Sequence, residues 1–572
     1  MRARDTESIS EGERIVVTFE GRPIEARRNE TVAAALSASG ILAWRSTRSG
    51  AERGVFCGMG VCQDCLISVD GRLQRACMTR IVRPLELRRQ RHAATASAPS
   101  MPETAAAGAA PLRPQLLVIG GGPAGLAAAT TAARSGVDVL LVDERPALGG
   151  QYYKQTADSP DLPSSRLADA QMAAGRQRID AARRAGVQVL QATEVIAAFE
   201  PRSVVIADAS GARVVLPERI VIATGAYEKP RPVPGWTLPG VMTTGAVQTL
   251  LRSYRVLPGR RVLIVGNGPL NHQVALELAR AGAEVVAVAE AAPPPWRARA
   301  RSLAAMTFSN AGLAAKGLAT LAELRLRRVP LIFGSVPEKV EATRNGLVVT
   351  LRDPGSGRQA LLTTDIVAMS YGFEPSSEVA RLLGCRHEID ARGCLATVTG
   401  DGFETSVPGV YAVGDCTGLG GAHAAEAAGG LAGLAVALSL GRLNSASAAA
   451  TAMGMRKNLI RHRRFQTALW QVFAVAPSAK SGGPAEAVAC RCEEVTLDRL
   501  SSQEEASLPG SLKRATRTGM GRCQARYCGR IVRELSGDRG EPPLPDGGAF
   551  APRPPVKPVP IGLLAGLELP DA

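Results

Sequence analysis

The segment QLLVIGGGPAGLAAATTAARSGVDVLLVDE, residues 115–144, restricts the fold of this chain more than any other stretch. An apolar run, a glycine-rich turn, an Ala-rich segment and a second apolar run follow one another, which is the order of a βαβ unit. The glycines fit G-x-G-x-x-G: the first permits a tight turn, the second lets a pyrophosphate approach the backbone, and the third permits close helix–strand packing. The helix N-terminus stabilises the anion, and an acid after the second strand binds ribose hydroxyls. The predicted dinucleotide contacts are Gly120, Gly122, Pro123, Ala124, Gly125, Asp143 and Glu144.

Three further motifs resemble those of flavoproteins that contain two dinucleotide-binding domains. They are ALGGQ at 147–151, VIATGAYEKP at 221–230 and TSVPGVYAVGDC at 405–416, and they follow the glycine turn in the order found in those flavoproteins. The resemblance implies an α/β core of the glutathione-reductase-like type that binds FAD, with Asp415 beside the ribityl chain. The FAD contacts that it adds are Gly150, Gln151, Ala223, Thr224, Gly225, Gly414 and Asp415.

A second βαβ pattern, RRVLIVGNGPLNHQVALELARAGAEVVAVAEA, occupies residues 260–291. Gly266 and Gly268 match the fingerprint and Glu290 ends the second strand, but Asn271 replaces the third glycine, so we expect it to hinder close helix–strand packing. In glutathione-reductase-like folds the inserted domain holds NAD(P)H, and no Arg follows Glu290 to favour a 2′-phosphate. NAD(P), another adenine nucleotide and a vestigial fold without a ligand all remain open here.

Four cysteines near the N-terminus stand in CGMGVCQDCLISVDGRLQRAC, with the spacing C-x4-C-x2-C-x11-C: Cys57, Cys62, Cys65 and Cys77. The first three have the spacing of plant-type [2Fe–2S] proteins. Zinc sites prefer paired C-x2-C elements, so zinc and a redox thiol pair are the weaker alternatives. This pattern predicts a [2Fe–2S] cluster.

A second set of four cysteines lies near the C-terminus, in ACRCEEVT and GMGRCQARYCGR: Cys490, Cys492, Cys523 and Cys528. The spacing is C-x-C, thirty residues, then C-x4-C, which resembles the bacterioferritin-associated ferredoxin type of [2Fe–2S] domain. An all-cysteine zinc site also uses two pairs and remains an alternative. Five basic residues near these cysteines either offset the charge of four thiolates or form a solvated face: Lys513, Arg514, Arg517, Arg522 and Arg526.

The remaining cysteines indicate no thiol chemistry. Cys385, Cys394 and Cys416 are isolated, and residues 114–450 contain no C-x-x-C motif, so we expect no disulfide exchange at the flavin.

Composition separates this chain from some classes of protein. The net charge is +16, but the basic residues are scattered and aromatic residues make up only 4% of the chain, so we expect no nucleic-acid partner. The N-terminus is polar, and the longest apolar run, AAGGLAGLAVALSLG at 427–441, is too short to cross a bilayer. We expect a cytoplasmic protein without a transmembrane segment, whose thiols are reduced or bind metal.

Changes in composition and in hydrophobic pattern divide the chain into eight parts. They are a ferredoxin-like domain at 1–91, an Ala/Pro-rich linker at 92–113, the first part of the FAD domain at 114–240, an inserted second Rossmann-like domain at 241–358, the second part of the FAD domain at 359–450, a helical connector at 451–484, a helical [2Fe–2S] module at 485–535, and an extended Pro-rich tail at 536–572. We expect the N-terminal domain to be β-grasp-like, with a hairpin and then a short helix.

In this order the motifs resemble the FAD- and [2Fe–2S]-containing alpha-type subunits of bacterial amine and amino-acid dehydrogenases, which act on opines, D-hydroxyproline, sarcosine or glycine. The most specific stretches are GVFCGMGVCQDCLISVDG, PGWTLPGVMTTGAVQTLL, VGNGPL, ACRCEEVT and TRTGMGRCQARYCG. The resemblance implies a heteromeric complex in which a second FAD-dependent amine-oxidoreductase-like subunit oxidises the substrate's C–N bond, and this chain transfers electrons.

Two other functions remain open at this point. The chain can be a self-contained NAD(P)H-dependent reductase of the ferredoxin type, or a redox- or iron-sensing protein that uses its clusters as switches. No catalytic residue is readable: Gln151, His423 and Glu426 fall in or beside FAD motifs, and cofactor contact or helix initiation explains them without an acid–base role.

Overall fold

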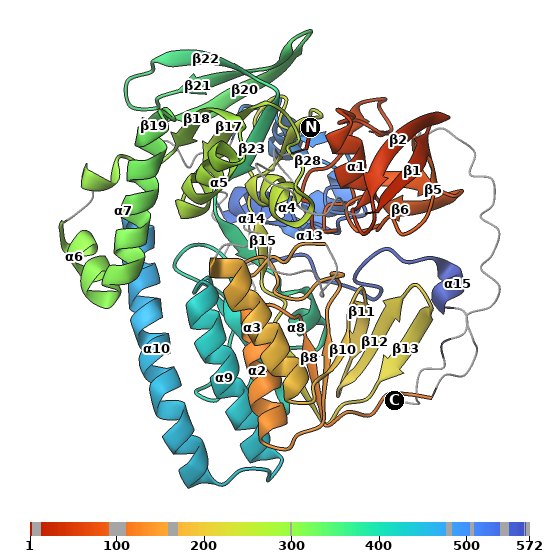
Figure 1. Cartoon of the computed structure of the whole chain (residues 1–572), viewed down its shortest axis with the longest axis vertical. Coiled ribbons are helices and arrows are strands. Elements are labelled where there is room, and N and C mark those ends of the chain that lie inside the picture. The colour runs from red at the N-terminus through yellow and green to blue at the C-terminus, as the bar shows by residue number, and fades with distance from the viewer. Residues whose placement is uncertain are drawn as a thin grey trace.

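The computed structural model describes residues 1–2, 13–90, 110–157, 170–297, 300–475, 483–503, 508–537, 548–564 and 567. Most of the expected linker at 92–113 lies outside these residues. The N-terminal domain and the second Rossmann-like sheet lie at one end of the molecule, and the first dinucleotide-binding sheet with its long helices forms the other end (Figure 1).

The N-terminal domain is a five-stranded mixed sheet covered by one helix, α1 (Val32–Ala38). The predicted hairpin is confirmed: β1 and β2 pair antiparallel, and Ile15, Val17 and Phe19 point into the core while their neighbours face outward. Thr31 caps α1 by accepting from the Ala34 N–H. In sheet order the strands are β2 (Arg22–Arg27), β1 (Arg14–Phe19), β7 (Glu86–Arg88), β5 (Leu66–Val69) and β6 (Arg72–Arg75), and a separate pair is β3 (Arg45–Ser46) with β4 (Glu52–Arg53).

The first dinucleotide-binding sheet is entirely parallel, and all its strands except the edge strand at 188–190 consist almost completely of buried apolar residues. Its order is β10 (Gln188–Leu190), β9 (Val139–Val142), β8 (Leu116–Ile119), β14 (Arg219–Ile222) and β27 (Val410–Ala412). An antiparallel sheet lies beside it and consists of β11 (Glu194–Phe199), β12 (Ser203–Asp208) and β13 (Gly211–Val215).

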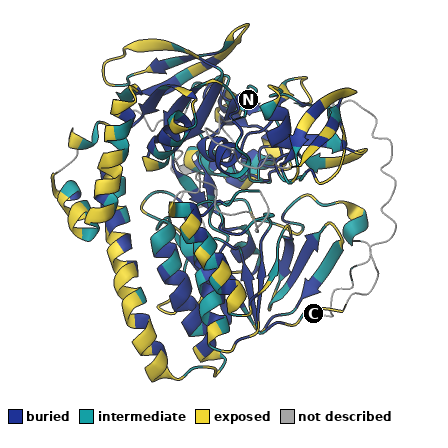
Figure 2. Ribbon diagram, in the orientation of Figure 1, coloured by how far each residue is buried: buried dark blue, intermediate teal, exposed yellow. Residues whose placement is uncertain are grey.

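Helices α2 (Pro123–Arg134) and α9 (Ala422–Ser439) pack very closely on this sheet. A Cβ atom on Gly429 would lie 2.1 Å from the carbonyl oxygen of Ala124, and one on Gly433 would lie 2.6 Å from that of Ala128. The apolar, glycine-rich run at 427–441 is therefore a buried core helix, which Figure 2 shows in dark blue and teal. No helix among the described residues is long and apolar enough to cross a membrane.

The second parallel sheet has the order β16 (Val241–Thr243), β23 (Ile366–Ser370), β17 (Arg261–Gly266), β18 (Glu284–Glu290) and β19 (Leu331–Phe333). It carries an antiparallel sheet of β20 (Val336–Thr343), β21 (Gly346–Arg352) and β22 (Gln359–Thr364). The expected boundary at 358 is wrong, because β22 completes the antiparallel sheet and β23 is a central strand of the parallel one. This unit therefore extends to Ser370.

Four helices belong to this second unit: α4 (Thr244–Tyr254), α5 (Pro269–Arg280), α6 (Ala300–Ser309) and α7 (Ala311–Leu326). The chain returns to the first unit through β24 (Phe373–Pro375), which pairs with β15 (Ala226–Glu228), and through α8 (Glu378–Leu382), β25 (His387–Ile389) and β26 (Leu395–Thr397). In the first unit α3 (Ala170–Arg184) packs beside α2.

The helical connector is α10 (Ser445–Val472), a single long helix that begins six residues before the expected limit at 451. Asn444 caps it by accepting from the Ser447 N–H at 2.8 Å. It packs against α9 and α6 and leaves its outer face exposed, as does α7 (Figure 2). It thereby spans both nucleotide-binding units.

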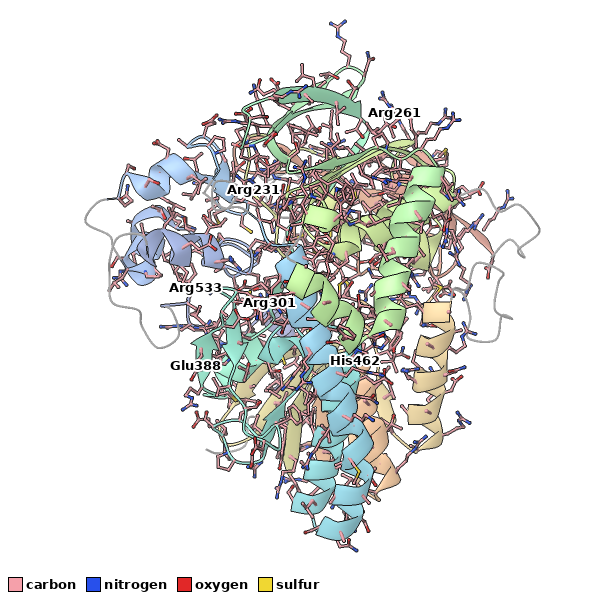
Figure 3. All side chains as sticks on the ribbon, turned by 90° about the vertical axis from the view of Figure 1, so that its left-hand side faces the viewer. Arg231, Arg261, Arg301, Glu388, His462 and Arg533 are labelled. Carbon is pink, nitrogen blue, oxygen red and sulfur yellow. The ribbon has the colours of Figure 1, made fainter. Side chains whose placement is uncertain are left out.

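The C-terminal module has its own small core around Leu500, Leu512 and Val532. Its elements are β28 (Val488–Cys490), β29 (Val495–Thr496), α12 (Leu497–Ser501), α13 (Pro509–Thr516) and α14 (Gly529–Gly537), and the described tail ends in α15 (Ile561–Leu564). Arg533, labelled in Figure 3, lies on α14 and donates to Glu374 at 3.0 Å and to the Gly393 carbonyl at 3.1 Å, so the module is docked on the first unit.

Candidate cofactor sites

A cavity of about 440 Å³ lies where the two nucleotide-binding units, the N-terminal domain and the C-terminal module meet. The predicted FAD residues converge on it from four separate segments, and Gly125 is the only one that does not line it. Those that line it are Gly120, Gly122, Pro123, Ala124, Asp143, Glu144, Gly150, Gln151, Ala223, Thr224, Gly225, Gly414 and Asp415.

The first glycine turn has the shape that a dinucleotide requires. Gly120 adopts a φ of 107°, and a Cβ atom there would lie 2.4 Å from the Ala223 carbonyl oxygen. A Cβ atom on Gly125 would meet the Gly120 carbonyl oxygen at 1.8 Å, so only glycine lets α2 approach the strand. A Cβ atom on Gly122 would meet nothing closer than the Gly150 Cα at 3.8 Å, so the fold itself does not require glycine here. The missing side chain instead keeps the cavity open.

The two acids after β9 have different environments. Asp143 accepts from the Gly121 N–H at 2.6 Å and the Arg145 N–H at 2.7 Å, which places it against the glycine turn. Burial raises the pKa of Asp143 to about 6. Glu144 instead pairs with Lys557 of the C-terminal tail, and this ammonium holds the pKa of Glu144 below its ordinary value against the opposing effect of burial.

Asp415 lies at the other end of the cavity, before the start of α9. Its Oδ1 accepts from the N–H groups of Gly420 and Gly421, each at 3.0 Å. Burial raises the pKa of Asp415. The cavity, the glycine turns that a Cβ atom would fill and the acids at both ends fit FAD. This cofactor, when bound, supplies an isoalloxazine ring that exchanges one or two electrons.

The second glycine turn is built differently. Glu290 is 1% exposed, and it accepts from the Gly268 N–H, the Asn267 amide and the Ala292 N–H at 2.9, 2.9 and 3.0 Å. Burial raises the pKa of Glu290 to about 7. Of the three predicted contacts only Gly268 lines the cavity; Gly266 and Glu290 do not.

The expectation that Asn271 hinders helix packing is wrong. Its side chain is buried, donates to the Ser370 carbonyl at 3.1 Å and accepts from the Thr244 hydroxyl at 2.9 Å. It lies 2.6 Å from where a Cβ atom of Gly266 would be, so α5 packs through the amide instead of through bare backbone.

The C-terminal end of α10 covers this second turn. The Trp470 ring lies 3.5 Å from where the Cβ of Gly268 would be, and the Asn267 amide donates to the Phe473 carbonyl at 3.0 Å. Trp470 also lines the cavity. The Trp470 side chain and the Phe473 backbone therefore lie over the position at which the fold would receive a second dinucleotide.

The N-terminal cysteines are all buried, and their sulfurs interact with one another and with backbone amides. Cys57 interacts with Cys62 and Cys77, and Cys77 also with Cys65. The Cys57 sulfur accepts from the Met59 and Cys62 N–H groups at 3.5 and 3.4 Å. Burial raises the pKa of Cys57, but the interactions with the Cys62 and Cys77 side chains, together with these backbone hydrogen bonds, outweigh it and hold the pKa well below its ordinary value. A thiolate with converging amides fits a [2Fe–2S] cluster.

The C-terminal cysteines form a similar group. Cys490 interacts with Cys528, and Cys492 interacts with Cys523. The hydrogen bond from Cys528 lowers the pKa of Cys490 to about 7. A Cβ atom on Gly521 would lie 2.1 Å from the Cβ of Cys492, so glycine is required for the loop to close over that cysteine.

Across the described residues, no group of three or more His, Cys, Asp and Glu side chains is arranged to hold a metal ion. This holds for both cysteine sets, so the arrangement of the sulfurs does not separate an iron–sulfur site from a zinc site. Spacing and the pairwise contacts between the sulfurs are what favour a cluster at each set.

Both cysteine loops reach the FAD cavity and each other. Met59 and Val61, inside the Cys57–Cys62 loop, line the cavity, and so does Arg526, inside the Cys523–Cys528 loop. Three aromatic rings connect the same places: Tyr227 of the cavity lies 5.8 Å from Tyr527, and Tyr527 lies 5.4 Å from Phe56. Tyr527 and Phe56 each precede a cysteine of one set.

The segment PGWTLPG explains part of how the C-terminal module is held. The Trp236 indole N–H donates to the Val488 carbonyl of β28 at 2.8 Å, and its ring lies 5.6 Å from that of Phe56. Trp236 is therefore packed between the two cysteine-containing parts of the chain.

The remaining predicted residues take varied positions. Cys385, Cys394 and Cys416 are buried, and burial raises the pKa of Cys394 to about 11 and that of Cys416 to about 12, as expected for inert thiols.

Two of the residues beside the FAD motifs form local contacts. His423 contacts the Tyr152 hydroxyl at 3.4 Å and stacks on His462, which Figure 3 labels on α10. Glu426 accepts from Tyr153 and Arg178 at 3.0 and 2.7 Å.

The five basic residues of the C-terminal module do not act as one group. Arg526 is buried in an ion pair with Glu378, and Arg517 pairs with Glu493 at the surface. Lys513 lies over the Phe550 ring, and Arg514 donates to the Ser511 hydroxyl. Burial lowers the pKa of Arg522.

Sequence reasoning missed Lys557, Trp470 and Met59 as cavity residues. Lys557 lies in a Pro-rich segment, Trp470 on a long helix of mixed composition and Met59 between two cysteines, and none of these settings carries a local signal for a cofactor.

Comparison with known proteins agrees with this geometry. Residues 114–429 match the pyridine nucleotide-disulphide oxidoreductase family, and residues 12–92 match the 2Fe-2S iron-sulfur cluster binding domain. The A subunit of opine oxidase from Agrobacterium tumefaciens (strain Ach5) is 35% identical over 475 residues, which cover 79% of this chain and 91% of that protein. The chain belongs to this family of flavin- and iron–sulfur-dependent oxidoreductases.

Two further members of the comparison extend it. Subunit HcnB of hydrogen cyanide synthase from Pseudomonas protegens is 30% identical over 460 residues, which cover 78% of this chain and 96% of that protein. The crystal structure of L-proline dehydrogenase from P. horikoshii superposes over 99% of this chain and 100% of that one with a TM-score of 0.70, and at 19% identity this likeness concerns the fold. The resemblance stated from the motifs is confirmed.

Proposed function

We propose that this chain is the electron-transferring, alpha-type subunit of a heteromeric amine or amino-acid dehydrogenase, and that it binds one FAD and two [2Fe–2S] clusters. The observation that carries the proposal is the shared cavity, which is bordered by the FAD motifs and by both cysteine loops. A single chain thus brings three redox sites into contact, which an enzyme that only bound substrate would not need.

The FAD site comprises the fourteen residues named from the motifs. The glycines shape the backbone around the pyrophosphate, Asp143 is placed for the ribose hydroxyls, and Asp415 lies beside the ribityl chain. Leu469 and Trp470 of α10 line the same cavity and exclude water from it. We assign no catalytic residue in this chain.

The first cluster is held by Cys57, Cys62, Cys65 and Cys77, within the matched 2Fe-2S domain. We assign the second cluster to Cys490, Cys492, Cys523 and Cys528. The observation in its favour is position: the second set borders the flavin cavity and the first cluster loop. A zinc ion does not change its oxidation state in proteins, so zinc would have no redox role at that position.

The partner is proposed from the relatives. Two of them are named as subunits, of opine oxidase and of hydrogen cyanide synthase. We infer a second FAD-dependent subunit that takes two electrons from the C–N bond of a small amine or amino acid, the substrate losing them with its protons to become an imine. The eleven cysteines are all free, which agrees with the cytoplasmic location that we propose.

We also propose the domain division given above, with the second Rossmann-like unit extended to Ser370. The competing function is a self-contained NAD(P)H-dependent reductase, and one observation favours it: Asn267 and Gly268 line the cavity. The burial of Glu290 and the contact of Trp470 with that turn weigh against it.

Three measurements on the purified chain test the proposal. Iron, sulfide and flavin analysis with electron paramagnetic resonance should give four irons, four sulfides and one FAD per chain, by the proposed composition. Two irons and one zinc would overturn the second cluster. The chain alone should not oxidise amino acids, and NADH should not bleach its flavin; rapid bleaching by NADH would establish the competing function.

A further inference from the structure

One buried ion pair separates the two cysteine sets. Arg491 lies between Cys490 and Cys492, and its Nε donates to the Oδ2 of Asp64 at 2.7 Å. Asp64 lies between Cys62 and Cys65 in the sequence. The side chains of Arg491 and Asp64 are 5% and 2% exposed, so water screens neither charge.

The guanidinium of Arg491 is fixed on every side. Its Nη1 donates to the Trp236 carbonyl at 2.8 Å, and its Cζ lies 3.8 Å from the Phe56 ring centroid and 4.6 Å from that of Trp236. Stacking of a guanidinium on aromatic faces strengthens in a desolvated site. Phe56 directly precedes Cys57, so this cation of the C-terminal module is held within the first cluster loop.

Asp64 is fixed as firmly. Its other oxygen, Oδ1, accepts from Arg45 of the N-terminal domain at 3.3 Å. Its own N–H donates to the Cys62 sulfur at 3.4 Å. Asp64 is thus bonded at one end to a cysteine of the first set and at the other to the residue between two cysteines of the second set.

Stability does not explain why this position holds an ion pair. A buried pair loses about as much on desolvation as its Coulomb attraction returns, and well-packed apolar residues often stabilise as well or better. The potential of an iron–sulfur cluster, in contrast, depends on nearby charge, on hydrogen bonds to its sulfurs and on solvent exclusion. This pair places charge beside both sets, and the Asp64 N–H adds a hydrogen bond to a sulfur of the first set.

We propose that Asp64 and Arg491 couple the two iron–sulfur sites electrostatically, so that the charge on either cluster sets the reduction potential of the other. The inference rests on the proposed second cluster. Reduction adds one electron, and so one negative charge, to a [2Fe–2S] cluster. Water does not screen the charges between the two sites, so the negative charge on one reduced cluster disfavours reduction of the other, and electrons enter the pair singly.

Potentiometry followed by electron paramagnetic resonance tests this on the full chain. Asp64→Asn removes a negative charge beside both clusters, so both reduction potentials should rise. Arg491→Met keeps the side-chain length and removes the cation, so both should fall. Arg491→Lys restores the charge and should bring both back toward the wild-type values, which a merely structural role of the arginine would not predict.

Arg517 provides a matched control. It also belongs to the C-terminal module, but it pairs with Glu493 at the surface and its side chain is 61% exposed. Arg517→Gln should leave the potential of the first cluster unchanged. If Arg491→Met or Asp64→Asn moved only one potential, or neither, in protein with four irons, the coupling would be overturned while the two-cluster assignment stood.

A folding defect is separable from a loss of coupling. The double variant Asp64→Asn, Arg491→Met removes both charges of the pair, and because the single changes act in opposite directions, its potentials should lie between theirs. In wild-type protein, a potential of the first cluster that is the same whether the second is oxidised or reduced would overturn the coupling. Iron analysis is done first on each variant, because wild-type protein that contains only two irons would overturn the second cluster itself rather than its link to the first.

Discussion

The two glycine turns of this chain begin from the same pattern and differ in what they leave open. The first, at Gly120–Gly125, presents bare backbone and Asp143 to a cavity. The second, at Gly266–Asn271, has an amide in place of the third glycine, keeps its acid out of the cavity and lies under Trp470. A strand–glycine–helix sequence therefore determines a fold, whereas the residues that pack over the turn decide whether a ligand can reach it.

The largest expected effect is at the third glycine of the first turn. Gly125→Ala places a methyl group 1.8 Å from the Gly120 carbonyl oxygen, so α2 must move off the strand. Overpacking of this kind should cost about 3 kcal/mol of unfolding free energy and abolish FAD binding. Urea denaturation of the apo-protein and flavin content of the purified variant measure the two effects.

Gly122→Ala is the matched control within the same turn. Its φ of −79° is available to alanine, and the nearest atom to the new methyl would be 3.8 Å away, so stability should change little while FAD binding is lost. In the second turn, Asn271→Ala should cost about 1–3 kcal/mol through the unsatisfied Ser370 carbonyl and Thr244 hydroxyl. If Gly125→Ala were as stable as Gly122→Ala, the idea that Gly125 is needed for helix packing and Gly122 for ligand access would be wrong.

The second prediction compares how Asp143 and Glu290 make stability depend on pH. Burial raises the pKa of Asp143 to about 6 and that of Glu290 to about 7, both above their values in an unfolded chain. The folded state holds the proton of each acid more tightly, so the contribution of each acid to stability should fall as pH rises from about 4.5 to 7 and then level off. The Glu290 contribution is about 3 kcal/mol over that window, from the size of the shift.

Urea midpoints measured from pH 4.5 to 8 check this dependence. Glu290→Gln should flatten the part of the profile between pH 6 and 7, whatever it does to stability at a single pH. FAD should alter only the part below pH 6, where Asp143 titrates. A Glu290→Gln variant whose profile runs parallel to that of wild-type protein over this window would contradict the raised pKa of Glu290.

How much of this the sequence could predict depends on how local each feature is. The glycine turns, the cysteine spacings and the βαβ order were readable because each is written within about thirty residues by the physics of one turn or one loop. Asp64–Arg491, Glu144–Lys557 and Trp470 over Gly268 join positions that are hundreds of residues apart. A single charged or aromatic residue carries no signal for a partner that only the tertiary fold brings to it.

The third prediction concerns a support that only the first turn has. Lys557 of the tail lines the cavity and pairs with Glu144, next to Asp143, and the N–H of its neighbour Val556 donates to the Ile196 carbonyl at 2.7 Å. Lys557→Met leaves Glu144 without its ammonium, so FAD should dissociate about tenfold faster, a loss of about 1.4 kcal/mol. Flavin release is followed by fluorescence after dilution.

Lys557→Arg keeps the charge and is the control for that experiment, because it should retain FAD nearly as well as wild-type protein. If Lys557→Met and Lys557→Arg released FAD at the same wild-type rate, the tail would have no part in closing the first site. The two turns would then differ only in their own residues.

The smallest expected effect is at the cover of the second turn. Trp470→Ala removes the ring that lies 3.5 Å from the position of a Gly268 Cβ, so NADH affinity, measured by isothermal titration, should rise over wild-type protein by about tenfold at most. The gain stays small because Glu290 remains bonded to the Gly268 N–H and is not free for a ribose. Trp470→Phe keeps the turn covered and should behave as wild type. A wild-type protein that bound NADH as tightly as Trp470→Ala would mean that packing over the turn does not restrict access, and that the second turn is as open as the first.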